Sequence, residues 1–356
     1  MNTRTHTCGE LTLSNVDESV SLNGWVNAVR FHGQVVFVDL RDRYGKTQIV
    51  YNQDDFSGDF SAIKKLSMED VLSINGSVRP REKNAVNPDM ETGEIEVFVS
   101  DHVLLNEAAP LPFIITDRDS AEEDLRLKYR YLELRTEELQ KNMLIRHNTY
   151  QEVRSFLSDN EFVEIETPIL MKSTPEGARD YLVPSRIHKG KFYALPQSPQ
   201  MYKQILMIAG FDRYFQIVKC FRDEDLRADR QPEFTQIDIE MSFVQEKDIF
   251  NICEQLTRHV FKQVENIELV DPFPRMTFSD AMSNYGTDCP DLRYNMKLQD
   301  MKSFSDKSDF NAFKSAETVA GIVVSDGAKY SRKVIDDFTD FVKRYKAKGL
   351  AWMKAE

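Results

Sequence analysis

Hydrophobic and polar positions alternate along this chain with two different periods, that of a β-strand and that of an α-helix, and the two periods are found in different segments. From residue 20 to residue 106 the apolar residues come in short runs, several with the two-residue alternation of half-buried β-strands. Further along, Glu137–Asp159 and Glu246–Glu265 carry apolar residues at helical spacing. Two runs between these helices, Tyr214–Val218 and Phe234–Ile239, alternate like a pair of strands. The pattern predicts a β module followed by a mixed α and β part.

The β module is predicted to contain five strands and one short helix. The strands are expected at Val20–Arg30, Gln34–Leu40, Thr47–Tyr51, Val71–Val78 and Ile95–Leu105, and the helix at Phe60–Leu66. A helix after the third of five strands is typical of the OB-fold, a barrel that often binds oligonucleotides, although many small barrels share this order. Residues 107–130, with two prolines and the charged run Asp117–Asp119, predict a linker. Both a hinge that docks RNA and an ordinary surface turn fit the Arg- and Tyr-rich end of this linker.

The predicted strand pair encloses a densely charged stretch, Phe221–Asp238, which reads FRDEDLRADRQPEFTQID. Loops longer than about a dozen residues are uncommon in compact domains unless they have a function. Arg222 and Glu224 are two residues apart, so we expect their side chains on the same face of one strand. A guanidinium beside a carboxylate on a sheet surface suits a phosphorylated ligand, and a solvated charged loop is the alternative.

Composition places the chain among globular proteins of two or three domains. It has 356 residues, of which 41% are hydrophobic and 29% are charged, and its net charge is −12. This acidic balance argues against a general nucleic-acid coat protein, but it leaves room for a local basic face. The four cysteines are far apart and predict neither a zinc site nor a disulfide framework. We expect a cytoplasmic protein, because neither a signal peptide nor an apolar run of membrane-spanning length is found.

The charged stretch also carries a family resemblance. The order Phe221-Arg222-Xaa-Glu224, a loop, and then Arg230, Phe234 and Asp238 at four-residue spacing resembles motif 2 of class II aminoacyl-tRNA synthetases, the bacterial aspartyl type in particular. The resemblance implies an α+β multidomain fold with four parts. These are an OB-fold anticodon-binding domain (1–106), a linker (107–130), an incomplete catalytic core built on an antiparallel sheet with flanking helices (131–293), and the start of an inserted α/β domain (294–356).

The resemblance implies roles for individual residues of the catalytic core. Catalysis is expected from Arg222 and Glu224, with Arg222 bridging the α-phosphate of ATP and the attacking carboxylate of aspartate. The expected ATP-binding residues are Arg222, Asp223, Glu224, Arg230, Gln231 and Phe234, and the expected aspartate-binding residues are Glu176, Gln200, Lys203, Arg222 and Asp238. The glycine-bearing loop 172–184 resembles the segment that closes over the amino acid, although by itself it fits an ordinary mobile loop.

Two further segments permit a structural or a functional interpretation. Ser198 and Pro199 predict the N-cap and first residue of a helix, which places Lys203 near the helix start; an anionic ligand and a solvated lysine are the alternatives. The long helix Glu137–Asp159 and the proline-ended strand 162–168 resemble motif 1, which implies a homodimer. A stripe that packs into the protein's own core is the alternative.

In the β module the resemblance implies a tRNA-binding face. Phe37 is expected to stack on an anticodon base, Gln48 to read a base edge and Arg30 to hold the backbone. By its spacing alone, Phe37 fits the barrel core better.

The family pattern is not completed within these residues. Motif 3 is not found, so we expect a fragment of a longer protein whose magnesium ligands lie in the remainder, and we predict no metal site here. The implied reaction is the ATP-dependent activation of L-aspartate and its transfer to tRNA by the full-length protein. A non-catalytic tRNA-binding fragment and an asparaginyl or lysyl relative remain alternatives.

Overall fold

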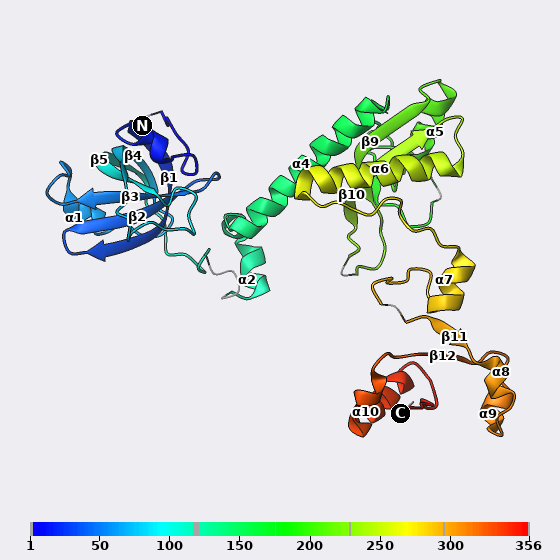
Figure 1. Cartoon of the computed structure of the whole chain (residues 1–356). Helices are drawn as coiled ribbons and strands as arrows, with labels where there is room; N and C mark the ends of the chain where they lie inside the picture. The colour runs from blue at the N-terminus through cyan, green and yellow to red at the C-terminus, as the bar shows by residue number, and fades with distance from the viewer. Residues whose placement is uncertain (1–2, 117–120, 175, 228, 295, 355–356) are drawn as a thin grey trace. The chain divides into compact units, whose positions relative to one another are not determined.

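The computed structural model describes residues 3–116, 121–174, 176–227, 229–294 and 296–354 (Figure 1). The charged run Asp117–Asp119 of the predicted linker lies outside these residues. The chain divides into two compact units, Met1–Ile267 and Glu268–Glu356. The candidate sites lie in the first unit.

The β module is a closed five-stranded barrel with the strand order β1-β2-β3-β5-β4. Its strands are β1 (Ser19–His32), β2 (Val35–Arg41), β3 (Lys46–Asn52), β4 (Val71–Pro80) and β5 (Ile95–Asn106), and α1 (Phe60–Ile63), which is shorter than predicted, follows β3. Alternate residues of every strand point inward and form one apolar core, for example Val36, Val38 and Leu40 of β2. The prediction of an OB-fold is confirmed, and the strand bounds agree with the predicted ones to within two residues.

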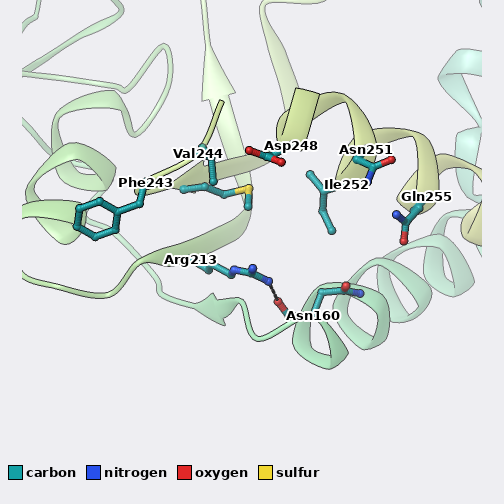
Figure 2. Close-up of a pocket in the computed structure, with 9 residues that line it drawn as sticks. Asn160, Arg213, Phe243, Val244, Asp248, Asn251, Ile252 and Gln255 are labelled. Carbon is teal, nitrogen blue, oxygen red and sulfur yellow. Dashed lines mark hydrogen bonds between the residues drawn. The ribbon is translucent and has the colours of Figure 1, made fainter. Parts of the chain in front are cut away.

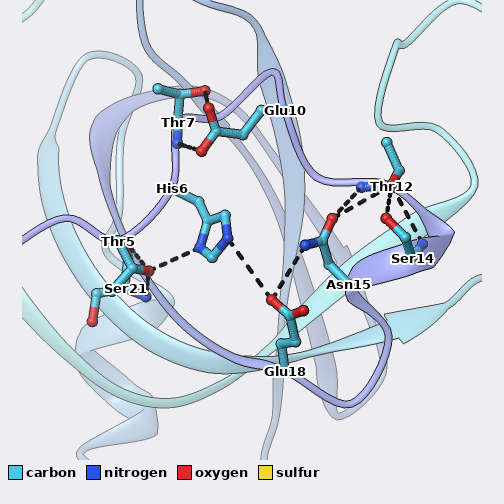
Figure 3. A network of polar contacts seen from close by, with 9 residues as sticks. All are labelled: Thr5, His6, Thr7, Glu10, Thr12, Ser14, Asn15, Glu18 and Ser21. Carbon is cyan, nitrogen blue, oxygen red and sulfur yellow. Dashed lines mark hydrogen bonds and ion pairs between the residues drawn. The ribbon is translucent and has the colours of Figure 1, made fainter.

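The N-terminal segment lies against the barrel and is held by short polar contacts (Figure 3). The backbone N–H of Ser21 on β1 donates to the Thr5 hydroxyl at 2.9 Å. Glu10 accepts from the backbone N–H and the hydroxyl of Thr7, at 3.0 and 2.9 Å. A capping box between Thr12 and Asn15 opens the short 3-10 helix η1 (Leu13–Asn15). The contact between Thr5 and Ser21 joins the segment to β1, and the other two contacts order the segment itself.

Three helices follow the barrel, and the third is long. They are α2 (Glu123–Lys128), α3 (Arg130–Glu133) and α4 (Glu137–Asp159), and the bounds of α4 are the predicted ones. The Thr136 hydroxyl caps α4 by accepting from the backbone N–H of Leu139. Val153 and Leu157, near the end of α4, are fully buried, whereas Met143 in its first half is 59% exposed. The apolar stripe of α4 is therefore core over only part of its length.

The candidate catalytic core is built on a three-stranded sheet in the order β10-β9-β6. The strands are β6 (Val163–Glu164), β9 (Arg213–Phe221) and β10 (Glu233–Met241), and β9 runs antiparallel to β10 and parallel to β6. The strand predicted over 162–168 is thus much shorter than expected, because only two of its residues pair with β9. Helices α4 and α6 (Glu246–Glu265) cross one face of this sheet (Figure 1). Phe215 of β9 packs there with Leu157 of α4 and Leu256 of α6.

The opposite face of the sheet is the polar one. Helix α5 (Gln200–Ile208) contacts β9 and β10, and Lys203 of this helix bonds to Asp238 of β10. The last three residues of the predicted loop 172–184 form β7 (Leu182–Pro184), which pairs in a hairpin with β8 (Phe192–Ala194). Strand alternation thus separates an apolar helix-covered face from a polar face that can bind a ligand.

The second unit is described by itself. It contains α7 (Phe278–Tyr285), the two-stranded sheet of β11 (Leu298–Asp300) and β12 (Ala320–Ile322), the short helices α8 (Lys302–Ser305), α9 (Asn311–Lys314) and η3 (Gly327–Lys329), and α10 (Arg332–Lys343). Gly286 ends α7 with a φ of 72°, a conformation that favours glycine. The predicted domain borders at residues 106, 130 and 293 stay predictions.

Candidate active site and nucleic-acid interface

The polar face of the sheet carries every second residue of β9 and β10. The register pairs Cys220 with Phe234, Val218 with Gln236 and Gln216 with Asp238. Side chains directly opposite each other in an antiparallel pair share a face, so these six residues form one surface. Most of the residues predicted for ATP and aspartate lie on this surface, on its α5 side, or on the loop at its end.

Arg222 and Phe234 meet at the loop end of this surface. The guanidinium carbon of Arg222 lies 5.0 Å from the ring centroid of Phe234, within cation–π distance. Strand β9 ends at Phe221, so Arg222 and Glu224 stand on the extended segment beyond the strand, not within it as expected. The Arg222 backbone N–H still donates to the carbonyl of Pro232 at 2.9 Å. The two chain segments therefore stay paired up to the residue that carries the guanidinium.

The charged loop beyond Arg222 is held by its own ion pair. Arg230 Nη1 lies 2.9 Å from Glu224 Oε2, and both side chains are partly exposed. The backbone N–H of Asp223 donates to the carbonyl of Arg179 at 3.0 Å, which ties this loop to the loop 172–184. Gln231 follows Arg230 on the same loop and is exposed. The outer end of the surface thus has two guanidinium groups in a solvent-accessible setting.

Lys203 holds the opposite, buried end of the surface. Its Nζ donates to Asp238 Oδ1 at 2.9 Å and lies 3.3 Å from Glu240 Oε2. Asp238 is only 2% exposed, and its other oxygen, Oδ2, is buried without a hydrogen-bond partner among the described residues. One cation thus faces two carboxylates, and one buried acceptor remains available for a donor such as an ammonium group.

The protonation of this pair follows from its burial. Burial raises the pKa of Asp238, and the hydrogen bond from Lys203 only partly offsets that effect. Burial alone would lower the pKa of Lys203, but the hydrogen bond and charge of Asp238, together with Glu240, outweigh burial and raise it. Lys203 is therefore firmly cationic, and the negative charge of Asp238 depends on it.

The loop 172–184 closes against the start of α5. Ser198 donates its hydroxyl to Glu176 Oε2 at 3.1 Å, and the Gln197 amide bonds to both backbone groups of Ala178 at 2.9 and 3.0 Å. The predicted N-cap is corrected by this contact: Pro199 is the N-cap, without a side-chain hydrogen bond, and α5 begins at Gln200. The Ser198 hydroxyl is directed to Glu176 and not to the helix. Glu176 thus contacts the segment that leads into α5, two residues before Gln200.

Several residues of this surface were not predicted from the sequence. Glu240 shares Lys203 with Asp238, and Cys220 lies 3.2 Å from Gln236 Oε1. Burial raises the pKa of the Cys220 thiol to about 11, so the thiol stays protonated. Alternation along β9 and β10 carries the signal for all three, since each lies two residues from a predicted residue on the same strand or its extension.

The barrel places its predicted residues on its outer surface. Arg30 makes a two-pronged contact with Asp39, at 2.7 and 2.6 Å, and also donates to Gln48 Oε1 at 3.2 Å. The Gln48 amide in turn donates to Glu96 at 2.8 Å. Phe37 points outward from β2 and is half-buried, opposite Arg30 in the register. The structure thus brings Arg30, Phe37 and Gln48 together, and it adds Asp39 and Glu96.

Two charged groups of this barrel surface have shifted pKa values. The hydrogen bond to Asp39 raises the pKa of Arg30 despite its partial burial. Burial raises the pKa of Glu96 more than the Gln48 hydrogen bond lowers it. The surface therefore offers a cation, Arg30, and acceptors that can take hydrogen bonds from base edges.

A separate pocket lies on the far side of the sheet and is lined by none of the predicted substrate residues (Figure 2). The pocket lies between the end of α4, the start of β9, the end of β10 and the start of α6. There Arg213 donates to the Asn160 carbonyl at 2.7 Å.

Among the described residues, no group of three His, Cys, Asp or Glu side chains is placed to hold a metal ion. Within the same residues, none of the helices has the length and apolarity needed to cross a bilayer.

Comparison with known proteins identifies the fold and the family. Residues 122–348 match the class II tRNA synthetases of the D, K and N group, and residues 20–105 match the OB-fold nucleic-acid-binding domain. The chain therefore belongs to the class II tRNA synthetases (D, K and N).

Individual relatives of high sequence identity are aspartate–tRNA ligases. The chain is 53% identical over 357 residues to an aspartate–tRNA(Asp/Asn) ligase of Desulfatibacillum aliphaticivorans, and 52% identical over 358 residues to an aspartate–tRNA ligase of Halalkalibacterium halodurans. Each alignment covers 99% of this chain and 60% of the relative, so the chain spans about three-fifths of the length of these relatives. The crystal structure of asparaginyl-tRNA synthetase from Pyrococcus horikoshii with asparaginyl-adenylate shares the fold, with a TM-score of 0.66 and 24% identity, over 75% of this chain and 59% of that one.

Proposed function

We propose that this chain forms the anticodon-binding and substrate-activating part of an aspartate–tRNA ligase. In the full-length protein the α-carboxylate of aspartate attacks the α-phosphorus of ATP, which forms aspartyl-adenylate and releases pyrophosphate. A ribose hydroxyl at the 3′ end of tRNA then attacks the aspartyl carbonyl and releases AMP. The observation that carries this proposal is the single polar sheet face, with Arg222 over Phe234 at one end and Lys203 between Asp238 and Glu240 at the other.

The exposed end of the surface suits the nucleotide. A half-buried Phe234 ring offers a stacking surface for adenine, and the guanidinium of Arg222 beside it can neutralise the α-phosphate. Arg230 pairs with Glu224, and its exposure allows it to turn towards the outer phosphates, with Asp223 and Gln231 nearby. Little covalent work is required of the protein, because positioning and charge neutralisation carry such a reaction. Arg222 and Glu224 are the proposed catalytic residues.

The buried end suits the amino acid. The cationic Lys203 is complementary to a side-chain carboxylate, which favours aspartate over asparagine and lysine. The partnerless Oδ2 of Asp238 and the carboxylate of Glu176 can accept from the α-ammonium group, and Gln200 stands at the start of α5 beside them. The names of the Desulfatibacillum and Halalkalibacterium ligases agree with this choice of amino acid.

The barrel is proposed to bind the anticodon of tRNA through Phe37, Gln48 and Arg30. The half-buried ring of Phe37 can stack on an unpaired base, while the network from Arg30 through Gln48 to Glu96 presents donors and acceptors beside it.

We also propose a cytoplasmic homodimer, since the exposed first half of α4, with Met143, offers an apolar surface to a second copy. Magnesium would accompany ATP, but the described residues form no ligand set for it, so no step is assigned to the metal.

Aspartate-dependent exchange of pyrophosphate into ATP tests the proposed activity. The full-length protein is assayed with aspartate, asparagine and lysine, and the 356-residue chain is assayed in parallel. We expect exchange with aspartate only. Stronger exchange with asparagine or lysine would assign the protein to one of those specificities. No exchange with any amino acid, together with retained tRNA binding, would support the alternative of a non-catalytic tRNA-binding protein.

A further inference from the structure

A buried carboxylate joins the barrel to the segment that leads into α4. Glu69 lies in the turn before β4 and is only 3% exposed. Its two carboxylate oxygens accept from Arg41 Nη2, at 2.8 and 3.0 Å, and Oε2 also accepts from Arg135 Nη1. Arg41 is the last residue of β2, whereas Arg135 lies outside the barrel, two residues before α4. One buried charge thus binds a residue from each part.

The next residue binds the other end of the connection between these parts. Asp70 is 2% exposed, and its Oδ1 accepts from the backbone N–H of Ala108 at 2.8 Å. Ala108 is the second residue after β5, so it lies at the start of the connection, and Arg135 lies at its end. Two adjacent acidic residues of the barrel therefore bind the beginning and the end of the connecting segment.

The backbone at Glu69 is strained. Its φ is 70°, in the left-handed region that residues with a Cβ rarely occupy. The backbone N–H of Glu69 donates to the Val26 carbonyl at 2.7 Å, and the Val26 N–H donates to the Asp70 carbonyl at 2.8 Å. These two bonds hold the turn against β1. Strain of this kind persists where surrounding contacts hold it, and it is concentrated at residues with a function.

Arg135 contacts the barrel in a second way. Its guanidinium carbon lies 5.4 Å from the ring centroid of Trp25 on β1, within cation–π distance. Arg41 already gives the buried carboxylate of Glu69 a positively charged partner from within the barrel. The additional contacts of Arg135 therefore serve the connection between the barrel and α4 rather than the barrel alone.

We propose that Glu69 and Arg135 are positioning residues for the charging of tRNA, because they hold the barrel in one orientation on the start of α4. The far end of α4 packs through Leu157 against Phe215 of β9, the strand that leads to Arg222. A rigid joint at the start of α4 therefore relates the proposed anticodon site to the proposed active site.

This joint would determine where the 3′ end of a bound tRNA lies. A tRNA that is held by its anticodon then presents its terminal ribose hydroxyl to the adenylate in one orientation, and a small displacement of a reacting group lowers the rate strongly. The inference rests on the proposed function, since it needs both the anticodon site and the active site.

Three measurements on the full-length protein test the joint. They are the charging of aspartate tRNA, aspartate-dependent pyrophosphate exchange without tRNA, and the binding of an RNA stem-loop with the anticodon-arm sequence. Arg135→Met breaks the joint but keeps the pair of Arg41 and Glu69, so the barrel should stay folded. We expect the kcat of charging to fall by ~10-fold or more, because the 3′ end is misplaced, while exchange and stem-loop binding stay at wild-type values.

Two further variants sharpen this test. Arg135→Lys keeps a positively charged donor and should recover part of the lost charging rate. Lys46→Met is the matched control, because Lys46 of β3 pairs with Glu137 at the start of α4, at 2.5 Å, but the Glu137 side chain is 78% exposed. An exposed ion pair contributes little, so this variant should charge tRNA at the wild-type rate.

The outcomes distinguish the joint from the function it serves. Charging at the wild-type rate by Arg135→Met, or an equal fall in Lys46→Met, would overturn the joint alone. An equal fall of charging and exchange in Arg135→Met would also overturn it, since the residue would then support the active site itself. Lost stem-loop binding would assign Arg135 to the fold of the barrel and overturn the joint as well. A wild-type protein that neither exchanges nor charges would overturn the proposed function and this inference with it.

Discussion

The barrel and the three-stranded sheet hold their polar residues in different ways. In the barrel, Arg30, Gln48 and Glu96 lie outside a closed apolar core, and the core does not depend on them. In the sheet, the buried Asp238 of β10 bonds to Lys203 of α5, whose side chain is 12% exposed, so the pair belongs to both the packing and the proposed aspartate pocket. Binding and folding are therefore separable in the barrel but coupled in the sheet. Substitutions in the sheet should therefore lower both stability and activity, whereas substitutions on the outer face of the barrel should not lower stability.

Lys203→Met should have the largest effect, because it removes a cation shared by two carboxylates. Removing one partner of a buried ion pair commonly costs about 3 kcal/mol or more, and we expect a loss of that order in the free energy of unfolding. Aspartate-dependent exchange in the full-length protein should fall by ~100-fold or more. Because burial already raises the pKa of Asp238, the stability loss should shrink as the pH is lowered and Asp238 takes up a proton.

Lys219→Met is the matched control for this prediction. Lys219 lies on β9 and pairs with Glu233 at 2.9 Å, but both side chains are about half exposed. An exposed pair of this kind contributes ~1 kcal/mol or less. Equal effects of the two variants on stability and exchange would contradict the proposed coupling at Lys203.

His102→Phe should have the smallest effect and should appear only in the pH dependence of the barrel. His102 stacks on Phe56 with a centroid distance of 5.4 Å, and its Nδ1 is buried without a partner among the described residues. Burial lowers the pKa of His102 below its usual 6.5, so below about pH 6.5 the unfolded chain binds more protons than the folded one. Stability is thus lost as the pH falls through this window, and the phenylalanine variant should lose less.

The urea midpoint of Trp25 fluorescence at about pH 5 and about pH 7.5 measures this effect. A Trp352→Phe background leaves Trp25, in the barrel, as the only tryptophan. His32→Phe at the exposed end of β1 is the control and should keep the wild-type pH dependence. An unchanged pH dependence in His102→Phe would show that this histidine does not link proton binding to the barrel.

The sequence predicted elements well where local signals determine them. The bounds of α4 and α6 were predicted from apolar spacing, and both agree with the structure. The barrel strands follow from their alternation and were predicted to within two residues. The meeting of Arg222 with Phe234 was predicted from paired strands, and the structure shows it with Arg222 one residue beyond the end of β9; their roles remain proposals.

Contacts between distant segments could not be predicted. Ser198 looked like a helix cap, but Glu176, 22 residues earlier, takes its hydroxyl. Lys203 was singled out for a substrate carboxylate, whereas its protein partners Asp238 and Glu240 depend on how α5 packs against β10. The strand over 162–168 was overestimated because its register with β9 covers only Val163 and Glu164. In each case the deciding neighbour is set by tertiary packing.

The central claim is that the Arg222 guanidinium and the Phe234 ring together hold ATP on the polar face of the sheet. Arg222→Ala in the full-length protein tests it most directly, with Arg154→Ala as the control, since Arg154 pairs with Glu164 on the surface at 3.0 Å. We expect aspartate-dependent pyrophosphate exchange to fall by ~100-fold or more in Arg222→Ala, while its unfolding midpoint and the Arg154→Ala exchange rate stay at wild-type values. Exchange near the wild-type rate in Arg222→Ala would contradict it.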